Sequence, residues 1–311
     1  MTTKNFEIPI VFIIFNRPDT TKKVFEEIKK IRPNKLFVIA DGPRPYREGE
    51  DEKCRLTREI INEVDWECTV YKNFSDINLG CKKRIYTGLN WVFEQVEEAI
   101  ILEDDCLPDP SFFEYCKRML ELYRDNEKIM SIEGTNLAKT WKDSDSSYHF
   151  SKYCALWGWA TWRRAWEKID INMSSWVRDD SKRLILNRLG KEQFEIYQNI
   201  FNKAFNGDID SWGYPWIYSV LVNNGLTVVP SKNLISNIGF GEGATHTKDV
   251  VPTLANLPRY KLNFPLKERE IIECDEEYDQ IYFNSHNPSV GVFRKILPNR
   301  LKNLLKKLIK K

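Results

Sequence analysis

Apolar positions in the first third of the chain follow two alternating patterns. Residues 8–15 (IPIVFIIF) form an unbroken apolar run rich in β-branched side chains, typical of a strand buried on both faces. In 19–31 the apolar residues return every three or four positions, which predicts a helix. Residues 35–42 (KLFVIADG) then predict a second strand that ends at an Asp-Gly pair. Together these segments predict a βαβ unit.

The same order returns further along the chain. Residues 68–75 and 99–105 read as strands, and 80–98 between them has the apolar spacing of a helix. Asp109 is placed to cap the next helix, with Pro110 in its first turn, where a missing N–H costs nothing. Strands alternating with helices predict an α/β fold with a mostly parallel central sheet flanked by helices.

The chain of 311 residues fits one large α/β domain. We expect this domain to cover residues 1–290, with a regular half at about 8–135 and a looser half at about 136–250. Residues 291–311 form a separate tail.

The tail differs from the rest of the chain in charge. It contains eight Lys or Arg and no acid, so the formal net charge of +2 leaves −6 on residues 1–290. Its leucines recur at helical spacing with lysines on the other face, which predicts a C-terminal amphipathic helix of the kind that lies on anionic membrane surfaces. A plain solvated tail is the alternative. Because the body is acidic and carries no nucleic-acid-binding motif, we expect no nucleic-acid partner.

Cysteine usage indicates the compartment. The seven cysteines are odd in number, include no C-x-x-C pair and are not accompanied by a histidine cluster. This favours a reducing compartment and argues against structural zinc. The apolar run at 8–15 is too short to span a membrane. We therefore expect a cytoplasmic protein that associates with membranes only peripherally, through its tail.

Polar residues follow each predicted strand. The strands end at 16–17 (NR), 41–42 (DG), 75–76 (SD) and 103–105 (EDD). Ligands of parallel sheets bind outside the carboxyl ends of the strands, so these side chains are expected at one site.

Three consecutive acids cannot all chelate one ion at a strand end, because successive side chains point to opposite faces. Glu103 and Asp105 share a face, and Asp104 opposes them. Mg²⁺ and Mn²⁺ prefer carboxylate, water and phosphate oxygens. We assign Asp105, nearest the open end, to the metal and Asp104 to a ribose hydroxyl of a nucleotide. The alternative role, a solvated loop or a helix cap, suits Asp109 better.

Several of these segments carry a resemblance to a known family. The sequences IPIVFIIFNRP, FVIADGPR, NLGCKKRIYTGLNWVFE, IILEDDCLPDPSFFEYC, WGWATWRRAW and SNIGFGEGATHT, within about residues 8–250, resemble a bacterial GT-A-type glycosyltransferase family related to N-acetylglucosaminyltransferase I, of the nucleotide-diphospho-sugar transferase superfamily. The resemblance implies a GT-A fold, with a nucleotide-binding first half and an acceptor-binding second half. It implies transfer of a sugar from a nucleotide diphosphate donor, most plausibly a UDP-sugar.

The resemblance also implies roles for individual residues. Asp105, the last acid of the motif, would bind Mn²⁺ or Mg²⁺, and Glu103 would belong to the donor site. Arg17 and Asp41 would hold the base and ribose. Alternatively, Arg17 is a surface residue before a turn.

Lys83 or Arg84 would lie near the nucleotide, or else both belong to a solvated helix face.

Three tryptophans are candidates for contact with a sugar. Trp157, Trp159 and Trp212 could form a wall against a sugar ring, since aromatic faces pack against the C–H faces of sugars; core packing is an equal alternative.

His246 lies in a Gly-rich loop (GEGATHT) that could close over the nucleotide. It could be a further metal ligand or a hydrogen-bond donor to phosphate, although a lone histidine is usually structural.

The catalytic base is where the sequence departs from the family. The N-acetylglucosaminyltransferase I sequence reads Trp-Asp-Asp-Trp where this chain reads DIDSWGYPW, so the expected acid is missing. Asp210 is the preferred substitute and Asp208 the second. The alternative is that both cap the helix that begins near Tyr214.

These inferences predict a metal-dependent, inverting glycosyltransferase in surface glycan or glycoconjugate synthesis. Its acceptor would be a glycan, a lipid-linked molecule or a protein. A sugar nucleotidyltransferase should carry a Gly-rich loop after its first strand, where this chain reads FNRPDTT. A non-catalytic carbohydrate-binding protein of the same fold is the other alternative.

Overall fold

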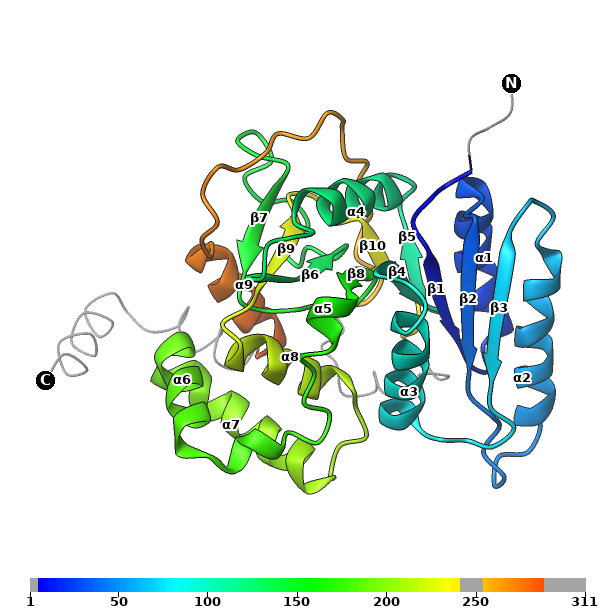
Figure 1. Cartoon of the computed structure of the whole chain (residues 1–311), viewed down its shortest axis with the longest axis horizontal. Helices are drawn as coiled ribbons and strands as arrows, with labels where there is room; N and C mark the ends of the chain where they lie inside the picture. The colour runs from blue at the N-terminus through cyan, green and yellow to red at the C-terminus, as the bar shows by residue number, and fades with distance from the viewer. Residues whose placement is uncertain (1–4, 241–253, 288–311) are drawn as a thin grey trace, which may run out of the picture.

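The computed structural model describes residues 5–240 and 254–287, whose centre is an eight-stranded sheet (Figure 1). Across the sheet lie β3 (Thr69–Phe74), β2 (Lys35–Ala40), β1 (Ile10–Ile14), β4 (Glu98–Glu103), β8 (Trp159–Trp162), β6 (Ile129–Glu133), β9 (Leu226–Pro230) and β7 (Tyr148–Ser151). A separate antiparallel pair joins β5 (Cys106–Pro108) to β10 (Ile235–Asn237).

Most neighbouring strands of the large sheet run parallel. β3, β2, β1 and β4 form a continuous parallel block, and β6 and β9 are also parallel. β8 is antiparallel to both β4 and β6, and β7 is antiparallel to β9. This confirms the predicted α/β fold class with a mostly parallel central sheet flanked by helices.

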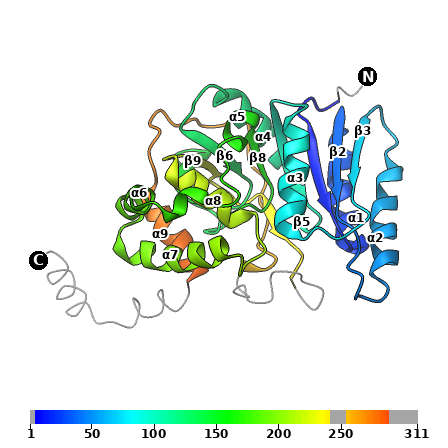
Figure 2. The ribbon, with the colours of Figure 1, turned by 60° about the horizontal axis from the view of Figure 1, so that its bottom comes forward.

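Helices cover both faces of the sheet. On one face α1 (Pro18–Ile31) and α4 (Ser111–Leu122) pack on the strands, and α2 (Glu50–Glu59) packs beside α1. The core on the other face includes α3 (Cys81–Phe93), α5 (Arg163–Trp166), α6 (Asp179–Leu189), α7 (Lys191–Asn206), α8 (Gly213–Val222) and α9 (Glu276–His286). Short 3₁₀ turns follow α2 (Ile60–Glu63) and precede α6 (Ser174–Val177). Figure 2 shows α6, α7 and α9 at the end of the molecule away from α1 and α2.

Strand β1 explains why the first apolar run is unbroken. Val11 and Ile13 belong to the core beneath α3, whereas Ile10, Phe12 and Ile14 belong to the core beneath α1. Every residue of β1 is buried. Both faces of this central strand therefore need apolar side chains, as predicted.

Several predicted boundaries need correction. The helix expected over 80–98 ends at Phe93, and the chain turns before β4 starts at Glu98. In the second half, α6 and α7 are separated by Gly190 at φ +76°. Helix α2 was not predicted. The cap role of Asp109 is confirmed, because its Oδ1 accepts the backbone N–H of Ser111 at 2.9 Å.

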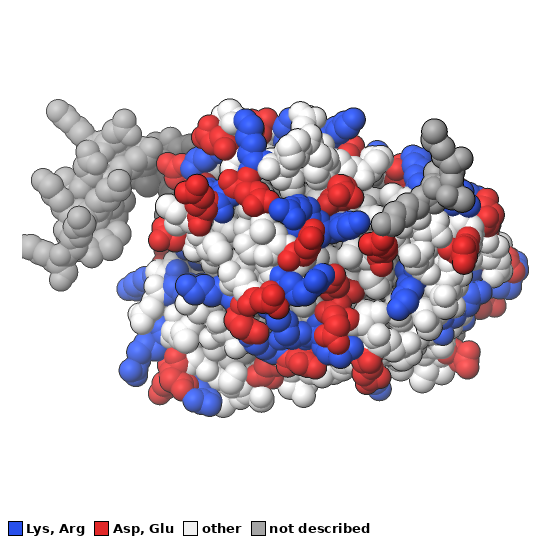
Figure 3. Space-filling view, turned by 45° about the horizontal axis from the view of Figure 1, so that its top comes forward, with Lys and Arg blue, Asp and Glu red and all other residues white. Residues whose placement is uncertain are grey.

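Two predictions concern membranes and charge. Among residues 5–240 and 254–287 no helix is long and apolar enough to cross a bilayer. The face drawn in Figure 3 carries acidic and basic side chains interspersed. Ion pairs such as Arg118–Glu268 and Arg124–Glu98 join residues that are far apart in the sequence. The tail at 291–311 lies outside the described residues.

Candidate functional site

The acids at the end of β4 point in different directions. Asp104 Oδ2 accepts the backbone N–H of Phe15 at 3.0 Å, just beyond the end of β1. Asp105 Oδ2 lies 2.8 Å from Nη1 of Arg17 in an ion pair. Glu103 is the last residue of β4 and is paired in register with β1. β4 ends at Glu103, so Asp104 and Asp105 lie in the turn that follows, and the prediction that Glu103 and Asp105 share one face of a strand is wrong.

Burial and mutual repulsion disfavour the ionised forms of two acids of this cluster. Burial, followed by the charges of Asp105 and Asp104, raises the pKa of Glu103 to about 8. Burial and the charge of Asp105 raise the pKa of Asp104 to about 7. Arg17 lowers both pKa values without outweighing these effects. A divalent cation would supply the missing positive charge, so the residues fit a Mg²⁺ or Mn²⁺ site.

Gly239 lies directly against this ion pair. A Cβ atom at this position would be 2.0 Å from Oδ2 of Asp105 and 2.6 Å from Nη1 of Arg17. The N–H of Ile238 also donates to the carbonyl oxygen of Asp105 at 2.8 Å. The chain leaving β10 therefore crosses over the acidic cluster at a position where a larger residue would clash.

Asp41 closes the loop that precedes α3. Its carboxylate accepts hydrogen bonds from the N–H groups of Gly42, Leu79 and Gly80 and from Nδ2 of Asn78. Only 7% of the residue is exposed. Burial raises its pKa, although the hydrogen bonds from Leu79 and Gly42 act in the opposite direction. Asp41 lies at the predicted strand end, but its oxygens are engaged by the protein itself.

The two candidate cations on α3 have different environments. Arg84 is buried, and its Nη2 donates to the carbonyl oxygen of Asn73 at 2.6 Å and to Oδ1 of the same residue at 2.7 Å. It therefore ties α3 to β3. Lys83 is exposed on the helix surface, which agrees with the alternative of a solvated helix face.

Asp210 reaches the N-terminus of α3 from the loop between α7 and α8. Its Oδ2 accepts the N–H of Cys81 at 2.9 Å, and its Oδ1 accepts the N–H of Lys82 at 3.1 Å. Asp208 is exposed. The N–H of Gly213 at the start of α8 is accepted by Oγ of Ser211 at 3.2 Å, so the prediction that these acids cap α8 is wrong, and Asp210 caps α3 instead.

The thiol of Cys81, at the start of α3, is influenced by the charges of carboxylates from several elements. Burial raises the pKa of this thiol most, followed by the charges of Glu103, Asp210 and Asp41. Carboxylates from the ends of β2 and β4 and from the second half of the chain thus act on one atom.

The structure favours core packing for two of the predicted wall tryptophans. Trp159 is 1% exposed and Trp212 4% exposed, and their rings stack with centroids 5.3 Å apart. Both also pack against Trp166, and Trp159 packs against Trp216. Trp159 is buried because β8 is an inner strand with helices over its face. Neither ring is available to a sugar in this arrangement.

Trp157 differs from these two. It is half-buried, and its ring lies edge-on to Phe240 with centroids 5.8 Å apart. It therefore adjoins the start of the Gly-rich segment and stays a candidate for the substrate wall. His246 lies outside the described residues.

Sequence reasoning missed Glu50, the first residue of α2. Its carboxylate is buried and accepts hydrogen bonds from Nδ2 of Asn16 at 2.8 Å and from the backbone N–H of Arg44 at 2.7 Å. The Arg44 guanidinium binds it as well, with Nε 2.9 Å from Oε2. Burial acts to raise the pKa of Glu50, but these bonds leave it below its usual value. The run of acids at 50–52 after Gly49 is a helix-start signal that could have indicated α2.

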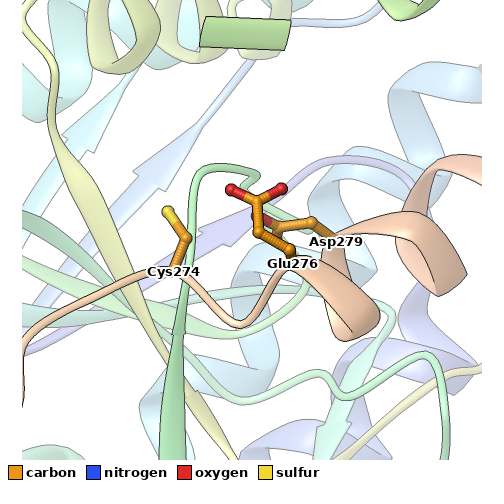
Figure 4. A group of neighbouring side chains, drawn as sticks. All are labelled: Cys274, Glu276 and Asp279. Atoms are coloured by element: carbon orange, nitrogen blue, oxygen red, sulfur yellow. The ribbon is translucent and has the colours of Figure 1, made fainter. Parts of the chain in front are cut away.

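A second acidic group lies at the start of α9 (Figure 4). Ligand atoms of Cys274, Glu276 and Asp279 lie within 4.8 Å of one another. The buried ammonium of Lys152, however, is 2.8 Å from Oε2 of Glu276 and 3.7 Å from Oδ2 of Asp279. The cluster after β4 is the better metal candidate because it lies at the carboxyl end of a parallel strand, where sheets of this kind bind ligands.

Comparisons with known proteins find distant similarity to solved structures. No family model matches the chain, and no curated protein matches it. A UDP-glucose pyrophosphorylase complexed with UDP-glucose is 10% identical with a TM-score of 0.36, over 76% of this chain and 96% of that one. Mouse xyloside xylosyltransferase 1 in its apo form is 9% identical with a TM-score of 0.33, over 69% and 81%.

A cytidylyltransferase from Leptospira borgpetersenii serovar Hardjo-bovis is 14% identical with a TM-score of 0.33. The match covers 54% of this chain and 64% of that chain, which is under two thirds of its length. The names of the three proteins describe a pyrophosphorylase, a xylosyltransferase and a cytidylyltransferase. Similarity at this level does not distinguish between their reactions.

Proposed function

We propose that the protein is a metal-dependent glycosyltransferase that moves a sugar from a nucleotide diphosphate donor, a UDP-sugar, to an acceptor hydroxyl with inversion. The observation that carries this proposal is the acidic cluster of Glu103, Asp104 and Asp105, in which Asp105 pairs with Arg17 and burial disfavours full ionisation of the other two acids. The cluster lies at the carboxyl end of β4, where sheets of this kind bind ligands.

In this proposal Asp105 holds Mg²⁺ or Mn²⁺, and Glu103, the last residue of β4, belongs to the donor site. Such a metal would neutralise the charge that a diphosphate gains as it leaves the sugar. Arg17, now paired with Asp105, is placed to bind the donor beside it. Asp104 is assigned to a ribose hydroxyl, and Asp41 supports the donor loop rather than lying open to solvent.

The second half of the chain supplies the acceptor side. Asp210 is the proposed base, because its carboxylate lies at the start of α3, where the charges of both Glu103 and Asp210 raise the pKa of the Cys81 thiol. The acceptor is a glycan, a lipid-linked molecule or a protein, and the tail at 291–311 is proposed to bring the enzyme to anionic membranes. We favour glycosyl over nucleotidyl transfer because β1 is followed by FNRPDTT, with no Gly-rich loop.

The proposal is tested by thermal unfolding with UDP and Mn²⁺, separately and together. A ligand at 100 times its dissociation constant adds about 2.7 kcal/mol of stability, which raises the melting temperature of a chain this size by several degrees. We expect UDP and Mn²⁺ together to stabilise the native protein more than the sum of their separate effects. Asp105→Asn should lose this joint effect while keeping its unliganded melting temperature, because the amide can still accept a hydrogen bond from Arg17.

Asp76→Asn is the matched control, since Asp76 is an exposed acid after β3 outside the cluster. It should respond to UDP and Mn²⁺ as the native protein does. A Mn²⁺-dependent shift that persists in Asp105→Asn would show that the metal binds elsewhere.

A further inference from the structure

A cavity lies between α2 and β3, the strand at one end of the eight-stranded sheet (Figure 1). Its volume of about 330 Å³ is at the lower end of the usual range for small-molecule sites. From β3 the lining residues are Lys72 and Phe74. From α2 they recur at helical spacing along one face of the helix: Asp51, Cys54, Arg55 and Arg58.

This cavity is separate from the proposed donor site. Phe74 packs against the core on the α1 side of the sheet, whereas α3 covers the other side. Strands β2 and β1 lie between β3 and β4, which ends in the acidic cluster. No residue assigned above to the donor, the metal or the base lines the cavity.

The cations in the lining differ in their partners. Arg55 is paired with the carboxylates of Glu52 and Glu59 on the same helix. Lys72 donates to the side-chain oxygen of Asn62 at 3.0 Å, which is a neutral group. The charge of Arg55 is therefore balanced within α2, and that of Lys72 is not.

Arg58 is a half-buried cation with unused donors. Its Nη2 donates to the carbonyl oxygens of Asp41 at 2.9 Å and of Ser75 at 2.7 Å, and its guanidinium carbon lies 5.0 Å from the centroid of the Phe74 ring. Its Nε is buried without a hydrogen-bond partner, and within residues 5–240 and 254–287 no carboxylate forms an ion pair with it. Because hydrogen bonds between a guanidinium and an anion are strong, Arg58 favours an anionic ligand.

The unpaired charges of the lining leave a positive balance. Asp51, an exposed acid at the start of α2, is opposed by Arg58 and Lys72. Side chains two residues apart on a strand emerge on the same face about 7 Å apart, so Lys72 lies close to the Phe74 ring over which Arg58 is placed. Phe74 and the buried Cys54 supply apolar surface beside these cations.

We propose that this cavity binds a small organic anion, a phosphate or carboxylate attached to a compact apolar group, with Arg58 and Lys72 as its cationic contacts. The apolar group would lie against Phe74 and Cys54. Because Arg58 also binds the carbonyl oxygens at the ends of β2 and β3, a bound anion would stabilise the join between these two strands. The site does not depend on the proposed transferase activity.

The test is a ligand-observed NMR titration with phenyl phosphate in the absence of divalent metal. Inorganic phosphate lacks the apolar group and benzyl alcohol lacks the charge, so both should bind more weakly than phenyl phosphate. Arg58→Gln should weaken phenyl phosphate binding about tenfold or more, because hydrogen bonds to a charged group are lost. Lys72→Gln should weaken it about threefold, the usual size for an exposed charge pair.

Lys72→Gln also serves where Arg58→Gln fails to fold, since Lys72 is exposed and does not hold the ends of β2 and β3. Lys53→Gln is the matched control, because Lys53 is an exposed lysine of α2 outside the lining, and it should bind phenyl phosphate like the native protein. UDP with Mn²⁺ should not displace phenyl phosphate. Displacement by UDP, unchanged affinity in Lys72→Gln, or no binding at millimolar phenyl phosphate would each overturn the proposal.

Discussion

Asp210 links the two halves of the chain through a single carboxylate. Both of its oxygens accept backbone N–H groups in the first turn of α3. Gly80, just before that helix, has φ +78°, and a Cβ there would lie 2.7 Å from Oδ2 of Asp210. These contacts hold the carboxylate of Asp210 at a defined position at the start of α3, as the proposed base requires.

Asp210→Asn is expected to lower kcat by roughly 10²–10⁴-fold with donor affinity little changed, because a general base acts on the acceptor hydroxyl in the transition state. The measurement is steady-state transfer kinetics, with water as acceptor where no better one is known. Asp208→Asn is the control, since its side chain lies exposed two residues away.

A purely structural role would give a different pattern. Loss of a helix cap costs about 0.5–2 kcal/mol of stability and would lower the melting temperature of Asp210→Asn without lowering kcat. That pattern, or a large fall in kcat only for Asp208→Asn, would rule out Asp210 as the base.

Residue type alone did not predict which aromatic side chains are accessible. Trp157 and Trp159 are separated by one glycine, yet the first is half-buried and the second 1% exposed. Their difference depends on β8 being inserted antiparallel between β4 and β6. That pairing joins segments far apart in sequence, so local pattern could not reveal it.

At the scale of elements, the sequence predicted what depends on local spacing. The parallel block of β1 to β4 with α1 and α3 follows from apolar runs and helical periodicity, which are read within a few residues. Helix α2 was missed because its ten residues are strongly polar, with Cys54 and Thr57 among its few buried positions. Glu50 was missed together with this helix, because it is the first residue of α2.

Packing of α3 on β2 depends on a small residue. A Cβ at Gly88 would lie 2.7 Å from Cγ2 of Ile39, so the helix approaches the strand closely here. Gly88→Ala gains up to about 1 kcal/mol in helix propensity but overpacks this contact at a cost of about 1–3 kcal/mol. We expect a net loss of stability, seen as a melting temperature lower by several degrees.

The control for this prediction is Thr87→Ala, at the neighbouring exposed position of α3. It should leave the melting temperature nearly unchanged, because no core contact is altered. A Gly88→Ala protein as stable as the native one would mean that α3 moves away from β2 at no cost.

At the scale of the whole molecule, the site is assembled from distant parts of one sheet edge. Asp105, which follows β4, contacts both the β1 loop through Arg17 and the chain leaving β10 at Gly239. The loop carrying Asp210 contacts the start of α3. The sequence predicted the strand-end acids and Arg17 as members of this site. Gly239 and the α3 cap depend on long-range folding and came only from the structure.

The central claim is that this site transfers a sugar from a nucleotide diphosphate donor with the help of a metal at Asp105. The most direct measurement is ion-exchange separation of the nucleotides formed when the native protein is incubated with a panel of UDP-sugars and Mn²⁺, with and without added pyrophosphate. We predict that UDP accumulates only when Mn²⁺ is present, that Asp105→Asn releases none, and that pyrophosphate yields no UTP. Formation of UTP from UDP-sugar and pyrophosphate, metal-independent release of UDP, or donors that all stay intact would contradict the account.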